Sequence, residues 1–171
     1  MSVIATINVG ANGATTLRGS SLALSTPADR QAFLALHRNA GSYLTGGNSF
    51  STERYSPSKT PIIILTRSDR KFGNRDDVNV VKVESNLKAT ISNVEANFPN
   101  PILVEAGATL LTALVDEGCI EELYLNQSPF DGDAHFIDIN KLLKHFEIVN
   151  EENIDGTILR KCRYQADSTD S

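Results

Sequence analysis

Short apolar runs separated by polar and glycine-rich segments set the pattern of this chain. Residues 2–9, 61–66 and 78–83 are rich in Val and Ile, and each is too short for an ordinary helix. Residues 42–45 and 102–105 are two further runs, each followed within two positions by a glycine. Runs of this length are typical of strands, and the unbroken run 61–66 is typical of a strand buried on both faces.

Between these runs, apolar positions recur at helical spacing. Over residues 26–40 they return every four positions, and a capping threonine followed by a proline stands at the start. Residues 86–97 carry a second apolar stripe, and residues 109–117 carry a third that ends at Gly118. We therefore expect strands and helices to alternate, with helices on both faces of the sheet.

The C-terminal part of the chain changes character. Residues 122–128 alternate apolar and polar positions like a strand, and a short amphipathic piece follows near 138–145. Residues 146–150 and 157–164 are expected to form a closing antiparallel hairpin. Together the pattern predicts an α/β protein with a mixed, mostly parallel sheet and an antiparallel C-terminal edge hairpin.

Size and composition indicate one folded domain. The chain has 171 residues, of which 40% are hydrophobic and 22% charged, as in ordinary globular proteins. We expect a single domain over residues 1–165 and a disordered tail over residues 166–171. This is enough chain for a small enzyme with a continuous core.

Net charge and hydropathy limit the classes of partner that the chain is expected to bind. The net charge of −5 and the lack of a Lys/Arg cluster argue against nucleic acid and favour a small-molecule partner. No run of about 18 apolar residues is present, and no basic segment precedes an apolar stretch near the start. We therefore expect no membrane span and a cytoplasmic location.

The cysteines and histidines give no metal-binding pattern. Cys119 and Cys162 are isolated, and His37, His135 and His145 are scattered without paired spacing. We predict no metal site, and we expect both cysteines to be small residues of the core.

Two glycine turns are candidate anion sites because each stands between a predicted strand and a helix start. They are Thr45-Gly46-Gly47-Asn48-Ser49 and Glu105-Ala106-Gly107-Ala108-Thr109. Free backbone N–H groups at a helix start hold phosphate, and small residues let the backbone approach it. Each turn could equally be an ordinary strand-to-helix loop. Neither has the G-x-G-x-x-G spacing of a standard dinucleotide fold.

A third element adds a cation. The run 61–66 leads into Thr66-Arg67-Ser68, which puts a guanidinium and two hydroxyls at the carboxyl end of a strand, where α/β proteins bind ligands. This group of side chains suits a cofactor 2′-phosphate, so it favours NADPH over NADH.

These motifs stand in the order found in a known family. Gly46 to Ser49 resemble its G-x-G-T turn, and Val104 to Leu111 resemble its V-E-G-G-x-T-L-L segment. Ile120 to Leu123 and Ser128-Pro129 resemble a later V-D-E-L strand and turn. On these residues the chain resembles the C-terminal reductase domain of the bifunctional riboflavin-biosynthesis deaminase-reductase and, more distantly, dihydrofolate reductase. It contains no P-C-x-x-C, so the zinc signature of the deaminase half, which combines H-x-E with P-C-x-x-C, is not present.

The resemblance implies a dihydrofolate-reductase-like three-layer fold, NADPH as cofactor and a homodimer. It implies that NADPH lies across the two glycine turns, at Gly46, Gly47, Asn48, Ser49, Ala106, Gly107, Ala108, Thr109 and Leu110. Thr66, Arg67 and Ser68 would then meet the 2′-phosphate.

At the substrate end the chain departs from the family. Asn12 stands where Asp is usual, Ala14 replaces a Lys, and His37 replaces an Arg. Glu105 is retained and, with Glu53, is the candidate proton source, although a glutamate there could simply cap the next helix.

Arg30 and Asn12 are the candidate substrate contacts. Arg30 could pair with a substrate phosphate or be an ordinary surface arginine.

Three functions follow from these residues and the resemblance. The first is hydride transfer from NADPH to a ribosylaminopyrimidine phosphate, as in the 5-amino-6-(5-phosphoribosylamino)uracil reductase step. The second keeps NADPH but reduces a pterin or another small imine or carbonyl compound, and the third is a non-catalytic nucleotide-binding relative.

Overall fold

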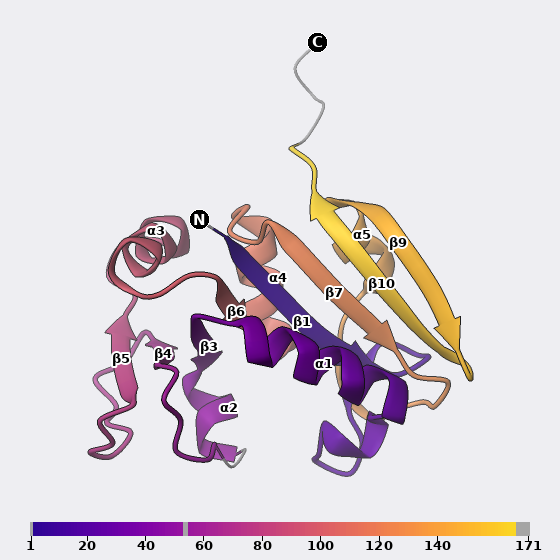
Figure 1. Ribbon diagram of the computed structural model, residues 1–171, viewed down its shortest axis with the longest axis horizontal. Coiled ribbons are helices and arrows are strands. Elements are labelled where there is room, and N and C mark those ends of the chain that lie inside the picture. Colours follow the sequence, from indigo (N-terminus) through magenta and orange to yellow (C-terminus); the bar gives the residue numbers. More distant parts are fainter. Residues whose placement is uncertain (1, 53–54, 167–171) are drawn as a thin grey trace.

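The computed structural model describes residues 2–52 and 55–166, and eight strands in them form the main sheet. These strands are β1 (Val3–Val9), β3 (Ser42–Gly46), β4 (Ile62–Thr66), β5 (Val78–Lys82), β6 (Ile102–Val104), β7 (Glu122–Gln127), β9 (Phe146–Ile154) and β10 (Thr157–Tyr164). Their order across the sheet is β5-β4-β3-β6-β1-β7-β10-β9 (Figure 1).

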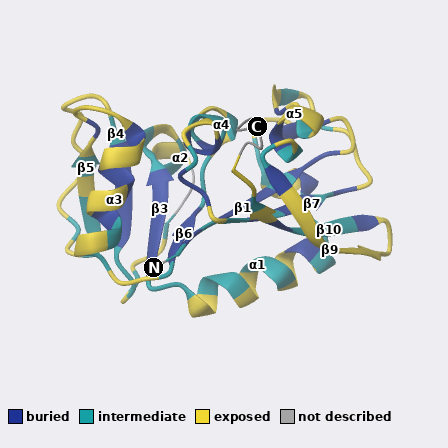
Figure 2. Cartoon of the chain, turned by 90° about the horizontal axis from the view of Figure 1, so that it is seen from above, coloured by how far each residue is buried: buried dark blue, intermediate teal, exposed yellow. Residues whose placement is uncertain are grey.

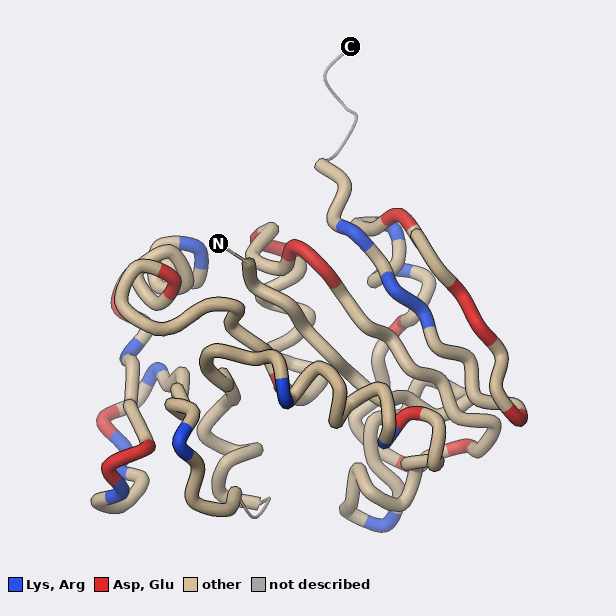
Figure 3. The backbone as a smooth tube through the Cα atoms, viewed as in Figure 1, with Lys and Arg blue, Asp and Glu red and all other residues tan. Residues whose placement is uncertain are grey.

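The direction of the strands matches the sequence pattern. All neighbours from β5 to β7 are parallel, whereas β10 is antiparallel to both β7 and β9. The predicted mostly parallel sheet with an antiparallel C-terminal hairpin is confirmed. Acidic residues of β9 lie beside basic residues of β10 (Figure 3), and Arg160 Nε donates to Glu151 Oε1 at 2.9 Å. Opposite charges on adjacent strands stabilise such a pair modestly.

In the described residues, five α-helices accompany the sheet. They are α1 (Pro27–Asn39), α2 (Gly47–Thr52), α3 (Leu87–Asn97), α4 (Ala108–Asp116) and α5 (Ile139–Leu143). Helix α1 covers one face of the sheet, and α3, α4 and α5 lie over the other (Figure 2). The predicted helices on both faces are confirmed, and the structure has three layers.

The larger part of the core lies between the sheet and helices α3, α4 and α5. Ala5, Leu44 and Val104 of the sheet pack there against Leu114 of α4, and all four are fully buried. A buried side chain of the size of leucine contributes about 1.5–3 kcal/mol relative to its exposed state. This face therefore holds the strands in register and fixes where they end.

Helix α1 packs differently because polar contacts hold its two ends. At its start Thr26 and Asp29 form a capping box, and Thr157 Oγ1 donates to Thr26 Oγ1 at 2.8 Å. Near its end Tyr43 Oη donates to the His37 carbonyl at 3.1 Å. Asp29 is the only buried residue among the thirteen of α1, all of which the structure describes. The helix thus leaves its inner face incompletely packed against the sheet.

The pattern missed several short elements. A two-stranded sheet joins β2 (Ala14–Thr16) to β8 (Ala134–Phe136), and a 3-10 turn covers Leu22–Leu24. Strand β9 runs to Ile154, four residues beyond its predicted end, because Asp155 and Gly156 form a tight turn with φ values of 50° and 90°. A two-residue Asp-Gly turn lets both strands continue to its edge.

Candidate functional site

The two glycine turns predicted from the sequence meet at one edge of the sheet. Gly46 ends β3, and Glu105 follows directly on β6, its neighbour in the sheet. The Glu105 N–H donates to the Leu44 carbonyl at 2.8 Å, and Thr45 Oγ1 donates to the Glu105 carbonyl at 2.9 Å. Parallel pairing therefore brings both turns to the carboxyl ends of adjacent strands, where this class of sheet binds ligands.

The turns face each other closely. A Cβ atom added at Gly46 would lie 3.3 Å from Leu110 Cδ2, and one added at Gly107 would lie 3.7 Å from Ser49 Oγ. Gly46 of the first turn thus faces Leu110, and Gly107 of the second turn faces Ser49. A larger side chain at Gly46 or Gly107 would occupy the space between them.

The start of α4 offers hydrogen-bond donors to this space. Its N-cap is Gly107, which has no side chain to accept from the first turn. The N–H groups of Ala108, Thr109 and Leu110 precede the first intrahelical bond, which Leu111 makes to the Gly107 carbonyl at 3.0 Å. Three free donors at the positive end of a helix dipole favour an anion.

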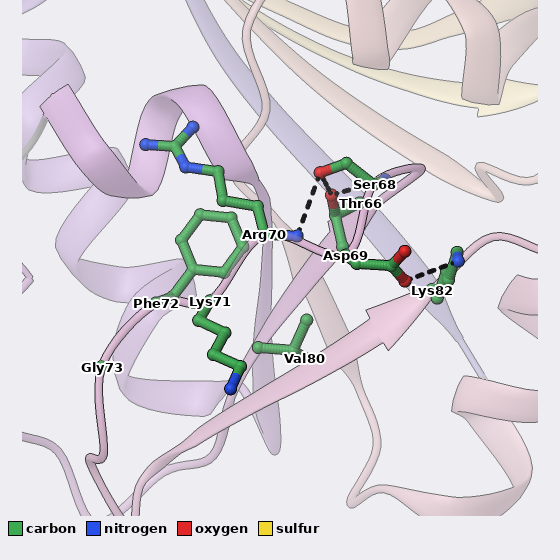
Figure 4. A pocket seen from close by; sticks show the side chains of 9 residues that line it. All are labelled: Thr66, Ser68, Asp69, Arg70, Lys71, Phe72, Gly73, Val80 and Lys82. Carbon is green, nitrogen blue, oxygen red and sulfur yellow. Dashed lines mark hydrogen bonds and ion pairs between the residues drawn. The ribbon is translucent and has the colours of Figure 1, made fainter.

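Beside the turns lies a groove of about 310 Å³ at the ends of β4 and β5 (Figure 4). It is lined by Thr66, Ser68, Asp69, Arg70, Lys71, Phe72, Gly73, Val80 and Lys82. Thr66 and Ser68 are among the residues predicted for the 2′-phosphate, and their hydroxyl oxygens lie 3.1 Å apart. Arg67 is exposed and does not line the groove, whereas Arg70 and Lys71 do.

Arg70 links the groove to the first glycine turn. Its Nη2 donates to Ser51 Oγ of α2 at 2.6 Å, and its guanidinium lies 5.0 Å from the centre of the Phe72 ring. Phe72 packs on the first glycine turn, since a Cβ atom added at Gly47 would lie 2.8 Å from Phe72 Cζ. A side chain at position 47 would therefore displace the Phe72 ring from the turn.

The positive charge of the groove rests on Arg70 and Lys71. Lys82 Nζ donates to Asp69 Oδ1 at 2.7 Å, which lowers the pKa of Asp69 and raises the pKa of Lys82. The charge of Lys82 thus has a carboxylate partner within the protein. Among the described residues, neither Arg70 nor Lys71 is paired with a carboxylate.

On the α1 side of the sheet, Glu105 approaches a histidine that sequence reasoning left out. Glu105 Oε1 lies 3.0 Å from His37 Nε2, and the two side chains are 13% and 33% exposed. The His37 ring stacks on Tyr43, with ring centroids 3.9 Å apart and planes inclined by 16°. The signal for His37 was its place on the inner face of the helix, four residues after Phe33, with which its ring is in contact.

Further polar residues lie on the sheet below α1. Thr6, Thr45 and Asn126 are buried, although polar side chains are uncommon in a helix–sheet interface. Asn126 Nδ2 donates to Asn8 Oδ1 at 3.1 Å. These polar groups lie on the face of the sheet that α1 covers, and Glu105 lies on the same side at the edge that carries the glycine turns, so they are candidates for contacts to a polar substrate.

Solved structures share this architecture. No protein-family model matches the chain. A protein named for riboflavin biosynthesis from Shewanella sp. PV-4 is 20% identical, with a TM-score of 0.75 over 97% of this chain and 100% of its own. Dihydrofolate reductase from Enterococcus faecalis, solved with NADP(H), is 14% identical, with a TM-score of 0.71 over 96% of this chain and 97% of its own. This chain has the dihydrofolate-reductase-like fold.

A longer protein shows the same fold over part of its length. The diaminohydroxyphosphoribosylaminopyrimidine deaminase/5-amino-6-(5-phosphoribosylamino)uracil reductase of Thermotoga maritima is 15% identical, with a TM-score of 0.67. The match covers 96% of this chain and 56% of that one, so this chain spans little more than half of the bifunctional protein. At these identities the likeness is one of fold, and the predicted dihydrofolate-reductase-like fold is confirmed.

The predicted substrate contacts Asn12 and Arg30 and the second candidate proton source, Glu53, are the remaining predicted site residues. Asn12 binds the backbone of Gly132 with both ends of its side chain, since Nδ2 donates to the carbonyl at 2.9 Å and Oδ1 accepts from the N–H at 3.1 Å. Arg30 is exposed on α1. Glu53 lies outside the described residues. Substrate binding by Asn12 and Arg30 and proton donation by Glu53 stay predictions.

Both cysteines lie in the core of the fold, as expected. Cys119 and Cys162 are free and buried, and burial raises the pKa of each thiol to about 11. Over the described residues, no three or more His, Cys, Asp or Glu side chains gather where a metal ion could be held. None of the helices in residues 2–52 and 55–166 has the length and apolar character that crossing a bilayer requires.

Proposed function

We propose that this protein is a reductase that transfers hydride from NADPH to a small polar substrate. The observation that carries the proposal is the meeting of two glycine turns at the ends of β3 and β6, beside a groove that holds Arg70 and Lys71. A dinucleotide needs an extended track with donors for its phosphates, and these elements supply one along a single sheet edge. Solved proteins of this fold include reductases, one of them in complex with NADP(H).

The donors present fit NADPH. The α4 N–H groups of Ala108 to Leu110 would hold the pyrophosphate, with Ser49 of the facing turn beside it. Thr66, Ser68 and Arg70 would hold the 2′-phosphate, because the groove combines hydroxyl donors with a guanidinium. When bound, the nicotinamide supplies the hydride.

The protein then has to orient the substrate and provide one proton. Glu105 is our candidate proton donor because it stands directly before the second glycine turn and its Oε1 has no hydrogen-bond partner among the described residues. Asn8, Asn126 and Thr6 would orient a polar heterocycle by hydrogen bonds. No covalent nucleophile is required for this chemistry.

We infer that the substrate is a ribosylaminopyrimidine phosphate, the compound class named for the Thermotoga maritima reductase. Hydride would add to the C=N or C=O carbon of the ribosyl group and open it to a ribitol chain. A pterin or another small imine is the alternative. Asn12 favours that alternative, because an uncharged side chain bonded to Gly132 stands where the riboflavin-pathway reductases carry an acid.

Titration with NADPH tests the cofactor. The chain has no tryptophan, so the fluorescence of NADPH itself can report binding without an overlapping protein signal. We expect saturable binding of NADPH and weaker binding of NADH. No binding at millimolar NADPH would leave only a non-catalytic role for the fold.

Turnover tests the substrate. Loss of NADPH absorbance with the aminopyrimidine ribosyl phosphate, but not with dihydrofolate, is the expected result. The opposite preference would refute the proposed riboflavin-pathway substrate but would still support the proposed reductase activity. The homodimer and the single domain over residues 1–165 also stay predictions, which light scattering and limited proteolysis can check.

A further inference from the structure

We propose that His37 is the positioning residue for Glu105, and that it passes protons from water to this carboxyl group during reduction. The proposal rests on the proposed function for the role of Glu105. Its geometric basis is the 3.0 Å distance between His37 Nε2 and Glu105 Oε1, which joins α1 to the end of β6. A histidine here departs from the family resemblance, which places an arginine at this position.

Contacts on two sides hold His37 in place. Its ring stacks on Tyr43 at 3.9 Å between centroids and meets Phe33 at 5.0 Å. Its backbone carbonyl accepts from Tyr43 Oη at 3.1 Å. The same tyrosine thus holds both the ring and the backbone of His37, and an imidazole held in this way loses little conformational entropy when it binds a carboxyl group.

Burial gives the two residues complementary roles. Glu105 Oε1 is shielded from water and accepts no hydrogen bond from any described residue, a state that is unfavourable unless a donor relieves it. A small rotation of the His37 ring would direct the Nε2–H at this oxygen. His37 keeps 33% of its side chain exposed, against 13% for Glu105, so it connects the buried carboxyl group to solvent.

Among the described residues, no second ion pair competes with the contact between His37 and Glu105. From the elements around it, His37 faces Tyr43 of β3 and Glu105, which directly follows β6. In the described residues, Glu105 forms no other ion pair. Within the described residues, His37 is thus the one basic side chain paired with the Glu105 carboxyl group.

The proton balance of the step is simple. Reduction adds a hydride to the substrate carbon, and the neighbouring nitrogen or oxygen then takes one proton. That proton leaves the Glu105 carboxyl group, and Glu105 Oε1 takes a replacement from Nε2 of the imidazolium form of His37. The imidazole is left neutral and takes up one proton from solvent. The hydride and its two electrons come from the nicotinamide cofactor of the proposed function, which is oxidised.

Two substitutions separate a structural role from a proton-carrying one. His37→Gln keeps a hydrogen-bond donor near Glu105 but cannot carry a proton, and His37→Ala opens a space for added imidazole. We expect His37→Gln to lower kcat about 10- to 100-fold, with NADPH affinity and substrate KM within about twofold of wild type. Imidazole should restore part of the kcat of His37→Ala. If His37→Gln keeps the wild-type kcat, or imidazole does not rescue His37→Ala, His37 carries no proton and the proposal fails.

His145→Gln is the matched control. His145 Nε2 lies 3.5 Å from Asp116 Oδ1, and its side chain is 25% exposed. It is a similar histidine–carboxylate pair, located at the C-terminal end of α4, opposite to the end that carries the second glycine turn. We expect this variant to keep the wild-type kcat. An equal loss of kcat in both variants would mean that removing a histidine acts through stability alone.

A measurement without turnover separates this inference from the proposed function. The ¹⁵N chemical shift of His37 Nε2 should differ between the wild-type protein and Glu105→Gln. The chemical shift of His145 Nε2 should be the same in both proteins. If NADPH does not bind, the proposed function fails while the resonance still decides whether the pair exists. If NADPH is oxidised but the resonance does not respond, only the pair is refuted.

Discussion

Replacing Arg70 by alanine should weaken NADPH binding much more than NADH binding. Arg70 lines the groove with Thr66 and Ser68, and its guanidinium is held by Ser51 Oγ at 2.6 Å and by the face of Phe72. A 2′-phosphate in this groove would meet an arginine that is already oriented. NADH lacks that phosphate, so it should not lose the same contact.

The size of the effect follows from the bonds removed. A hydrogen bond between a guanidinium and a phosphate contributes about 1.5–3 kcal/mol, because both groups are charged. One such bond corresponds to about 10- to 150-fold in affinity. Loss of the Ser51 contact should cost the fold only about 1 kcal/mol, because that bond is on the surface and Ser51 can bind water instead.

The assay compares Arg70→Ala with Arg67→Ala. Arg67 was the residue predicted from the sequence, but it does not line the groove, so it is a matched arginine three positions away. NADPH and NADH are titrated against each variant, and the ratio of the two dissociation constants is compared with wild type. An equal loss for both cofactors in Arg70→Ala would refute its contact with the 2′-phosphate. A selective loss in Arg67→Ala instead would return that role to Arg67.

Three further outcomes test the fold and its ionisable groups. Ile63→Ala should lower the free energy of unfolding by about 2–5 kcal/mol in urea denaturation, because Ile63 is fully buried on β4; a loss below 1 kcal/mol would mean that the core collapses around the gap. The hydrogen bond from Arg75 lowers the pKa of Asp77 to about 2, below the ordinary value near 4. The stabilisation from this pair is thus complete above about pH 4 and is lost as the pH falls towards 2. In Asp77→Asn, the melting temperature should therefore fall less steeply over that pH interval than in the wild-type protein. An unchanged slope would contradict the pairing. Because burial raises the thiol pKa of Cys119 and Cys162 to about 11, both should react with a disulfide reagent at pH 8 only after denaturant is added, and rapid labelling of the native protein would contradict their burial.

Periodicity was a good guide where burial repeats with the backbone. Ile62, Ile63 and Ile64 are all buried because β4 is covered on both faces, and an unbroken apolar run is what such a strand requires. The pattern failed where an element has little apolar surface. Strands β2 and β8 have three residues each and pair across more than a hundred positions, so nothing local in either segment indicates the pairing.

Some features of the candidate functional site likewise depend on local sequence, and others depend on tertiary structure. The sequence by itself determined the glycine turns, the strand ends that carry them and the cap of α1, because these depend on residues within a few positions of one another. Tertiary structure alone decided that Gly46 faces Leu110, that Arg70 rather than Arg67 lines the groove, and that His37 meets Glu105. Each of these contacts joins segments that the parallel strand order brings together, and that order is set by packing across the whole sheet.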